Sequence, residues 1–339
     1  MTSLAQAMTL VIVEERGVAG MLARISDPFW FQAFGCVLGF DWHSSGLTTT
    51  TCGALKEGLR DVSAEIGLVV AGGKGKTSRR TPSEIEAACE RSGLDAAPLV
   101  RASRLSAKVD SAAVQDGYQV YQHTFLFADD GTWAVVQQGM NESNGMARRY
   151  HWLTPPAFDS DPHAGVAGLH EQGVLNLVAA EAGGNRGVAV ELAREHPSKI
   201  STEIARLQAA EPRHLSMPRR HEARLSDVDP ARIERVLLKS YEAQPADYTS
   251  LLAVPGVGAK GLRALSLVAE LTYGEPASVK DPVSFSYAHG GKDGTPYPVN
   301  REVYDSTVES LRRVLSGTKV ERSEKRAALT RLAGLPTRA

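Results

Sequence analysis

An aspartate and a histidine lie one residue apart where an apolar stretch of the chain ends. The stretch is Cys36–Phe40, and Asp41 and His43 follow it within the next three positions. A carboxylate and an imidazole at this spacing can bind a divalent metal ion, or can hold and deprotonate a water molecule. The alternative is a turn in which Asp41 accepts backbone N–H bonds and has no chemical role.

Further groups with related chemistry occur in the same half of the chain. Four of the nine histidines lie in its compact polar motifs: His43, His123, His151 and His163. Two adjacent arginines, Arg148 and Arg149, carry planar guanidinium groups that match the oxygens of a phosphate. We expect at least two of the four histidines to share one active centre. A structural role for each histidine by itself is the alternative.

These residues define a candidate centre for cleaving a phosphodiester bond. Carboxylate and imidazole groups would hold a metal ion or activate water, and guanidinium groups would stabilise the added negative charge of the transition state. The candidate catalytic residues are Asp41, His43, His123, Arg148, Arg149 and His151. The candidate ligands of a divalent metal ion, Mg²⁺ or Mn²⁺, are Asp41, His43 and His163.

A glycine turn in the C-terminal half could bind a phosphate group. Pro255-Gly256-Val257-Gly258 separates two apolar runs, and Lys260 follows two residues later. Glycine permits backbone angles and close approaches that a Cβ forbids. The first N–H groups of a helix that begins at Ala259 would have no partner within it and would lie at its positive end. Gly256, Val257, Gly258 and Lys260 are therefore candidate phosphate contacts, and a plain helical hairpin is the alternative.

The glycine-rich basic stretch Val69–Arg80 is a second candidate phosphate site. We interpret it as a flexible loop between a short strand and a helix that begins near Pro82. Its candidate contacts are Lys74, Lys76 and Arg79. The spacing does not match the GxxxxGK[ST] pattern, which argues against an ATP-binding loop of that kind. A solvated surface loop is the alternative.

Hydrophobic periodicity predicts the elements that position these residues. Residues 1–25 predict a helix, and Cys36–Phe40 and Leu47–Thr51 predict two short strands. Tyr118–Ala128 and Thr132–Gln138 predict a β-hairpin around an Asp-Asp-Gly turn.

The second half of the chain reads as mainly helical. Residues 164–210 predict an alanine-rich helix interrupted at Gly183-Gly184, and helices are also expected near 229–242 and 301–315. The Gly/Pro-rich stretch Lys280–Tyr304 carries tyrosine, histidine, lysine and aspartate, which suggests a functional loop.

Composition limits the class of protein. The chain has 339 residues, 42% of them hydrophobic, which is enough for two globular domains. A net charge of −1 excludes a wholesale polycation, so any nucleic-acid surface must be a local basic patch. Three cysteines without CxxC spacing and the lack of a long apolar run favour a reducing cytoplasm and no membrane partner.

The sequence also resembles a known motif and a known protein family, and both resemblances extend these predictions. The Pro-Gly-Val-Gly turn with Lys260 resembles the helix-hairpin-helix motif of DNA repair and recombination proteins, which grips one backbone phosphate without reading sequence. The strings GFDWHSSG, AGGKGKTSRRTP, WAVVQQGMN, MARRYHWL and SYAHGGKDGTPYPV are similar to those of the prokaryotic family DUF763, across nearly the whole chain. That resemblance implies a cytoplasmic protein of bacteria or archaea and supplies no catalytic residues.

The sequence therefore predicts an α/β or α+β N-terminal domain and an all-α helix-hairpin-helix C-terminal domain. The expected boundaries are 1–210, a basic linker at 211–224, the hairpin domain at 225–316 and a basic tail at 317–339. The leading hypothesis is a metal-dependent nuclease of DNA repair or recombination. The alternatives are a non-enzymatic DNA-binding module that recruits a partner, and an enzyme that modifies a nucleotide or base. The oligomeric state stays open.

Overall fold

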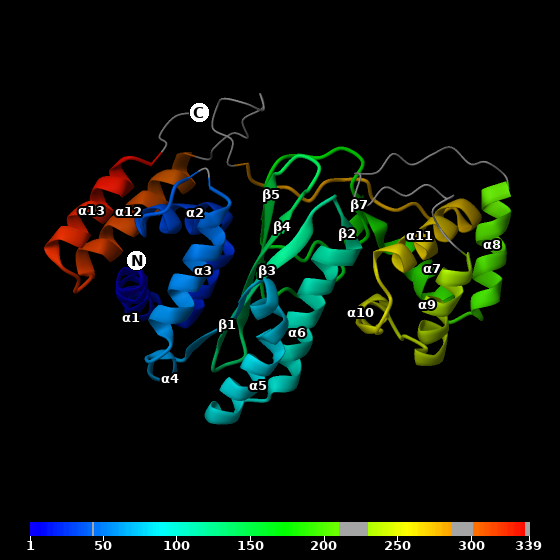
Figure 1. Cartoon of the computed structure of the whole chain (residues 1–339), viewed down its shortest axis with the longest axis horizontal. Coiled ribbons are helices and arrows are strands. Elements are labelled where there is room, and N and C mark those ends of the chain that lie inside the picture. Colours follow the sequence, from blue (N-terminus) through cyan, green and yellow to red (C-terminus); the bar gives the residue numbers. More distant parts are fainter. Residues whose placement is uncertain (43, 210–229, 287–300, 336–339) are drawn as a thin grey trace.

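A five-stranded antiparallel sheet forms the centre of the computed structural model, which describes residues 1–42, 44–209, 230–286 and 301–335 (Figure 1). The strands lie in the order β1-β3-β4-β5-β6. Their bounds are Leu68–Lys74 for β1, Gln119–Ala128 for β3, Trp133–Met140 for β4, Ala147–Leu153 for β5 and Gly165–Ala167 for β6. A separate antiparallel pair joins β2 (Val114–Gln115) to β7 (Leu175–Asn176).

Helices from both ends of the chain cover the first face of the sheet. The helices next to the strands are α1 (Thr2–Ser26), α2 (Pro28–Val37) and α3 (Gly46–Leu59), and the short α4 (Ser63–Ile66) leads into β1. Behind them pack α12 (Arg301–Gly317) and α13 (Arg322–Ala333). All of these except α4 contribute to one hydrophobic core with Leu126, Ala134 and Val136 of the sheet.

The second face carries two helices and a helical lobe. After β1 come a 3₁₀ turn, η1 (Gly75–Arg80), then α5 (Thr81–Ser92) and α6 (Ala96–Lys108), which ends in a π-helical turn, η2 (Val109–Ala113). The lobe follows the 3₁₀ turn η3 (Ala180–Ala182). It contains α7 (Gly183–Ala193), α8 (Pro197–Ala209), α9 (Pro230–Ala243), α10 (Tyr248–Ala253) and α11 (Ala259–Tyr273). Its core is continuous with that of the second face.

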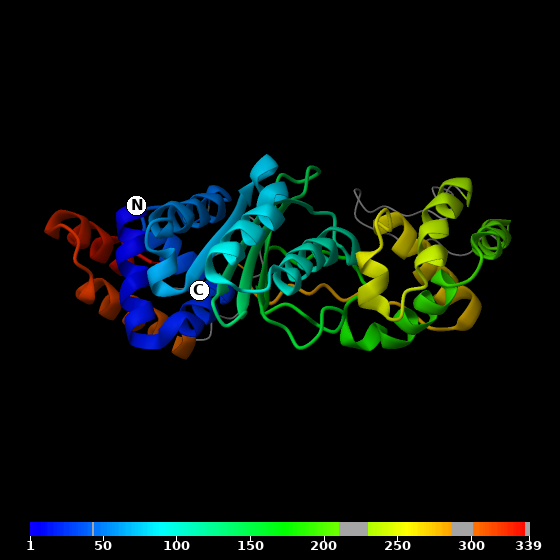
Figure 2. The same ribbon diagram turned by 90° about the horizontal axis from the view of Figure 1, so that it is seen from below.

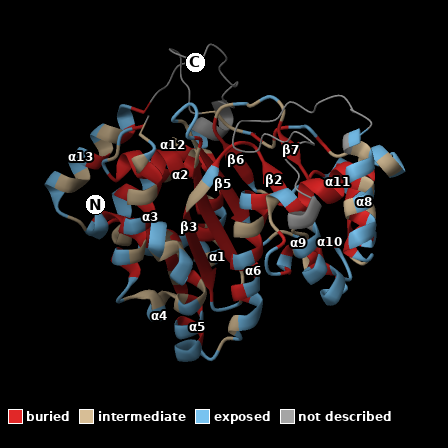
Figure 3. Ribbon diagram, turned by 45° about the vertical axis from the view of Figure 1, so that its right-hand side comes forward, coloured by how far each residue is buried: buried red, intermediate tan, exposed pale blue. Residues whose placement is uncertain are grey.

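The sheet is buried on both sides, and the two groups of helices extend the molecule in opposite directions (Figures 2 and 3). The lobe that holds α9–α11 lies at one end, and α12 and α13 lie at the other. A strand covered on both faces has buried side chains at successive positions, instead of an alternation of buried and exposed ones. In β4, every residue from Trp133 to Gly139 is buried. Among the described residues, no helix combines the length and the hydrophobicity needed to cross a bilayer.

Several predictions from periodicity are confirmed, because the segments concerned carry strong local signals. The predicted first helix is α1, which has a kink at Gly17, and the helix expected after Pro82 is α5. The β-hairpin is β3–β4, and its Phe125↔Val135 register places both residues in the same core. The mixed fold, with strands and helices first and mainly helices later, is also present.

The two strands predicted around Asp41 are wrong. Cys36 and Val37 end α2, and Leu47–Thr51 lies inside α3. A short apolar run does not distinguish a buried strand from a buried helix. The decisive signal lies upstream, because the Asp27 carboxylate accepts hydrogen bonds from Phe29 N (2.8 Å) and Trp30 N (3.1 Å) and Pro28 occupies the first helical turn.

Other segments also differ from the sequence reading. Gly183 begins α7 instead of interrupting a helix, and residues 164–182 contain β6 and β7. Within the expected basic tail, Arg322–Ala333 forms α13, and its residues Ala328 and Leu332 are buried in the core of the first face. The expected linker at 211–224 lies outside the described residues.

Gly72 is the position where the glycine-rich stretch is conformationally constrained. Its φ is +90°, and a Cβ added there would lie 2.3 Å from the His123 carbonyl oxygen of the adjacent strand. Gly75 also has a positive φ, +60°, but a Cβ on it would meet nothing within 4 Å. Gly72 and Gly73 therefore belong to β1 and allow close strand pairing, whereas a flexible loop was expected.

We expect Gly72→Ala to lower the free energy of unfolding by about 2–5 kcal/mol, from left-handed strain plus overpacking. Gly75→Ala serves as the matched control, since it carries the strain alone and should cost roughly 1–2 kcal/mol. Urea denaturation of the two variants measures both values. Equal losses for the two variants would contradict the close approach of β1 to β3.

Candidate nucleic-acid interface

The glycine turn between α10 and α11 lies at the surface and is anchored from below. Pro255 and Gly256 are exposed, while the Val257 side chain is fully buried among the apolar residues of the lobe. Gly256 has φ +93°, a value that favours glycine. Val257 N–H donates to the Val254 carbonyl at 3.3 Å. Val257 therefore holds the turn in place, and its amide is already used, unlike the phosphate contact expected from the sequence.

Five amide groups of this turn and the first turn of α11 make no hydrogen bond to any described residue. They belong to Gly256, Gly258, Ala259, Lys260 and Gly261. The carbonyl of Gly258 is used, since it accepts from Leu262 N at 3.0 Å and begins the helix. Free amides at the start of a fifteen-residue helix combine hydrogen-bond donors with the positive end of the helix dipole.

Two lysines flank the same turn. Lys260 is exposed on the first turn of α11. Lys239, on α9, places its Nζ 3.5 Å from the position that a Cβ on Gly256 would occupy. Neither ammonium group forms an ion pair within the described chain. Lys239 was not found from the sequence, because it lies 17 positions before Gly256 and no local pattern connects them.

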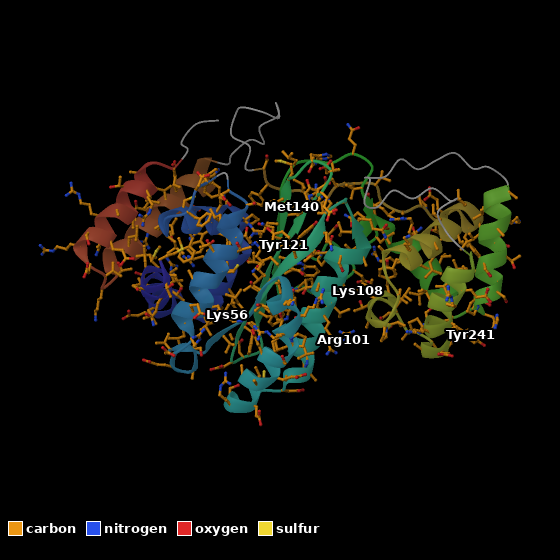
Figure 4. The ribbon with its side chains drawn as sticks, viewed as in Figure 1. Lys56, Arg101, Lys108, Tyr121, Met140 and Tyr241 are labelled. Atoms are coloured by element: carbon orange, nitrogen blue, oxygen red, sulfur yellow. The ribbon has the colours of Figure 1, made fainter. Side chains whose placement is uncertain are left out.

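The turn after α2 and the basic stretch after β1 meet at one end of the sheet. Lys74 lies over the ring of Tyr121, with Nζ 5.7 Å from the ring centroid. The Tyr121 hydroxyl is hydrogen-bonded to the amide nitrogen of Gln138, and this nitrogen also donates to the Ser45 carbonyl at 2.8 Å. Figure 4 shows Tyr121 near the upper part of β3. Ser45 and Lys74, which are 29 positions apart in the sequence, are thus connected through Tyr121 and Gln138.

Asp41 and two further cations of this region, Lys76 and Arg79, are at the surface. Asp41 is exposed, and its negative charge contributes to the raised pKa of Cys36, about 12, for which burial is the main cause. Lys76 and Arg79 are on η1, and both are exposed. His43 lies outside the described residues, so the structure does not report on the Asp41–His43 pair.

Arg148 and Arg149 point to opposite faces of β5, because successive strand residues alternate. The Arg149 guanidinium faces α1–α3. It donates from Nε to His151 Nε2 at 2.6 Å and from its terminal nitrogens to Gln32 Oε1 (2.9 Å) and Pro28 O (3.0 Å). Since His151 Nε2 accepts, its proton is on Nδ1, which donates to Ile25 O at 2.8 Å. Burial first, and then the Arg149 charge, lower the pKa of His151 and keep it neutral.

Arg148 is the centre of a buried ion cluster on the second face. Its guanidinium contacts Asp116 (2.9 Å) and both carboxylate oxygens of Asp281 (3.0 and 2.8 Å). Asp116 also accepts a hydrogen bond from the Tyr150 hydroxyl at 2.6 Å. Burial disfavours the charged guanidinium, but the two carboxylates outweigh it and raise the pKa of Arg148. The two arginines do not form the pair expected from the sequence.

His123 and His163 share a hydrogen-bond network on this second face. His123 Nδ1 donates to Gln137 Oε1 at 2.9 Å, and the Gln137 amide nitrogen donates to Asp110. Asp110 is fully buried and lies 2.6 Å from His163 Nε2. Burial raises the pKa of Asp110, and His163 opposes the shift. Two of the four histidines are thus linked, but on the opposite face of the sheet from His151.

The expected metal ligands are not brought together in the described part of the chain. His163 contacts Asp110 on the second face, whereas Asp41 follows α2 on the first. No group of three or more histidine, cysteine, aspartate or glutamate residues able to hold a metal ion occurs among the described residues. Asp110, Asp116 and Asp281 were not singled out from the sequence. No local pattern marks the first two, since the stretch 109–120 that contains them also carries Ser111, Gln115 and Gln119.

The architecture defines a mixed α+β protein with an exposed glycine turn on a helical lobe. The chain belongs to the DUF763 family, described as "Protein of unknown function (DUF763)", whose profile matches residues 1–299. The search of curated proteins gave no match, and neither did the search of solved structures.

The buried imidazole of His123 makes stability depend on pH. Burial is the main reason why its pKa falls from 6.5 to about 4. Between these two pH values His123 is neutral in the folded protein, whereas it would be protonated in the unfolded chain. Above pH 6.5 it is neutral in both states, so it does not reduce the free energy of unfolding there. As pH falls from 6.5 towards 4, unfolding takes up a proton and about 3 kcal/mol of stability is lost.

Urea titrations of the wild type and His123→Gln between pH 4 and pH 7.5 measure this effect. The variant lacks the imidazole, so its free energy of unfolding should fall less steeply below pH 6.5. The difference between the two slopes corresponds to at most one proton taken up on unfolding. Parallel pH profiles for the two proteins would show that His123 is not held neutral by burial.

Proposed function

We propose that the protein binds the backbone of DNA through the glycine turn between α10 and α11. One observation carries the proposal: the free amides around Gly256 and Gly258 lie beside the ammonium groups of Lys239 and Lys260 at an exposed surface. Backbone N–H groups at a helix start and a nearby positive charge are the groups that bind phosphate.

The chemistry of this surface favours a polyanion bound without sequence recognition. Amide donors and lysines contact phosphate oxygens, which are the same for every base pair. The net charge of the chain is only −1, so attraction comes from the local arrangement of cations. Phosphate contacts of this type release counterions, and binding should therefore weaken steeply with added salt.

We expect Lys239→Ala/Lys260→Ala to weaken binding of duplex DNA and to reduce the slope of log K against log[salt] by about 2, since each lost phosphate contact accounts for roughly 0.9. Fluorescence anisotropy with a labelled duplex between 50 and 200 mM salt measures both quantities. Arg322→Ala/Arg326→Ala on α13 removes two exposed cations at the opposite end of the molecule and should leave the slope unchanged. Wild-type protein that does not bind duplex at 50 mM salt would refute the proposal.

Metal-dependent hydrolysis of the bound strand is the second candidate function. The observation that favours it is the contact between the Asp41–Ser45 turn and the Lys74 region through Tyr121 and Gln138. Asp41 would bind Mg²⁺ or Mn²⁺ or activate water, together with His43, which lies outside the described residues. Lys74 would hold a phosphate nearby.

We expect duplex, single-stranded or branched DNA to be cleaved with Mg²⁺ or Mn²⁺ and not with a chelator. Asp41→Ala should abolish cleavage while binding is retained, because an exposed carboxylate contributes little to the fold. The Lys260→Ala variant should bind DNA more weakly, but it should still cleave DNA when the protein is at a saturating concentration. Gel electrophoresis of labelled DNA measures the products. Binding without cleavage under every metal would favour a recruitment module, and no binding would leave an enzyme that acts on nucleotides or bases.

A further inference from the structure

Helix α6 carries three cations along one side. Arg101, Arg104 and Lys108 are spaced by three and four residues, which places them within one face of the helix. The cations lie on the side of α6 that its buried residues leave open, between Val100 and Leu105. The buried residues are Leu99, Val100, Ala102, Ser103, Leu105 and Ser106. None of the three cations makes a hydrogen bond or ion pair with a described residue. We call Arg101, Arg104 and Lys108 the α6 stripe.

Among the described residues, the three cations of the stripe have no acidic partners at ion-pair distance, although the charge of Arg101 acts on the nearby Asp247 carboxylate. Helical pairs elsewhere in the chain do have them, such as Arg60 with Glu57 and Lys199 with Glu195. Lys108 is only partly exposed, and burial lowers the pKa of its ammonium group. A partly desolvated cation without a counter-ion in contact costs stability, so Lys108, on the same face as the exposed Arg101 and Arg104, favours an anionic ligand there.

The stripe is adjacent to the glycine turn. Helix α10, which leads into the turn, packs against α6. Asp247, at the start of α10, has a lowered pKa, caused chiefly by Ser250 and in smaller part by the charge of Arg101. At the other end, Gln115 follows η2 and joins the start of α11, since its Nε2 donates to Ala259 O at 2.9 Å. Figure 4 labels Arg101 and Lys108 along α6, beside α10.

We propose that the α6 stripe is a second contact for the DNA backbone held by the glycine turn, so that one duplex crosses the seam between the sheet and the helical lobe. This inference rests on the proposed DNA binding. Lys108 follows Arg101 by seven positions of helix, a rise of about 10 Å. Successive phosphates of one strand advance by roughly 3.4 Å along the duplex axis, so the stripe is long enough for about three phosphates.

The test is the salt dependence of duplex binding by Arg101→Ala/Arg104→Ala/Lys108→Ala, with Lys319→Ala/Arg322→Ala/Arg326→Ala as the matched control. Both variants lose three positive charges, but the control positions are at the far end of the molecule, on and just before α13. With a slope of about −0.9 per phosphate, a rise from 50 to 200 mM salt should cost the wild type about 40-fold more affinity than the α6 variant.

The outcomes separate this inference from the proposed function. A shallower slope for the α6 variant, with the control equal to wild type, supports the second contact. Equal slopes for both triple variants, while Lys239→Ala/Lys260→Ala still weakens binding, would overturn the α6 contact and leave the turn in place. If the wild type does not bind duplex at all, both proposals fall. Circular dichroism of each variant establishes that α6 is folded, which is expected because alanine favours helix.

Discussion

The position of the helical lobe depends on the buried charge of Arg148. This guanidinium on β5 is held between Asp116, which follows β2, and Asp281, where the chain returns from the lobe to the sheet. Both ion pairs are fully buried, and an unpaired charge there would cost about 3–5 kcal/mol. The ion pair therefore stabilises this position of Asp281, and the chain that follows it is hydrogen-bonded to β6 through Ser284 and Phe285.

Polar contacts at the seam extend the same constraint to the glycine turn. Arg263 on α11 donates from Nε to Gln115 Oε1 at 2.8 Å, and the amide of Gln115 donates to Ala259 and Ala112 carbonyls. The start of α11 is thus attached to the turn that ends α6. In the proposed DNA complex, a surface built from both elements would present its donors and cations in one geometry, which lowers the ordering cost of binding.

Strong local signals account for what the sequence predicted well. The helix at Pro82 and the hairpin around residues 129–131 follow from capping, turn chemistry and periodicity, which act within a few residues. Strand β5 was missed, because its arginines, tyrosine and histidine are polar on both sides and are buried only by partners such as Gln32 and Asp281. The Cys36 run was assigned to a strand because a short apolar segment carries no period.

By itself, the sequence determined where the glycine turn lies, since Gly256, Gly258 and Lys260 are close along the chain, and the tertiary core holds that turn in place through the buried Val257. Only the tertiary structure decided which cations accompany the turn, because Lys239 and the α6 stripe arrive from other helices. It also separated Arg148 from Arg149, because strand alternation sends neighbours to opposite faces and each face has its own core. Spacing along a chain specifies local backbone geometry, whereas convergence of side chains depends on how the layers pack.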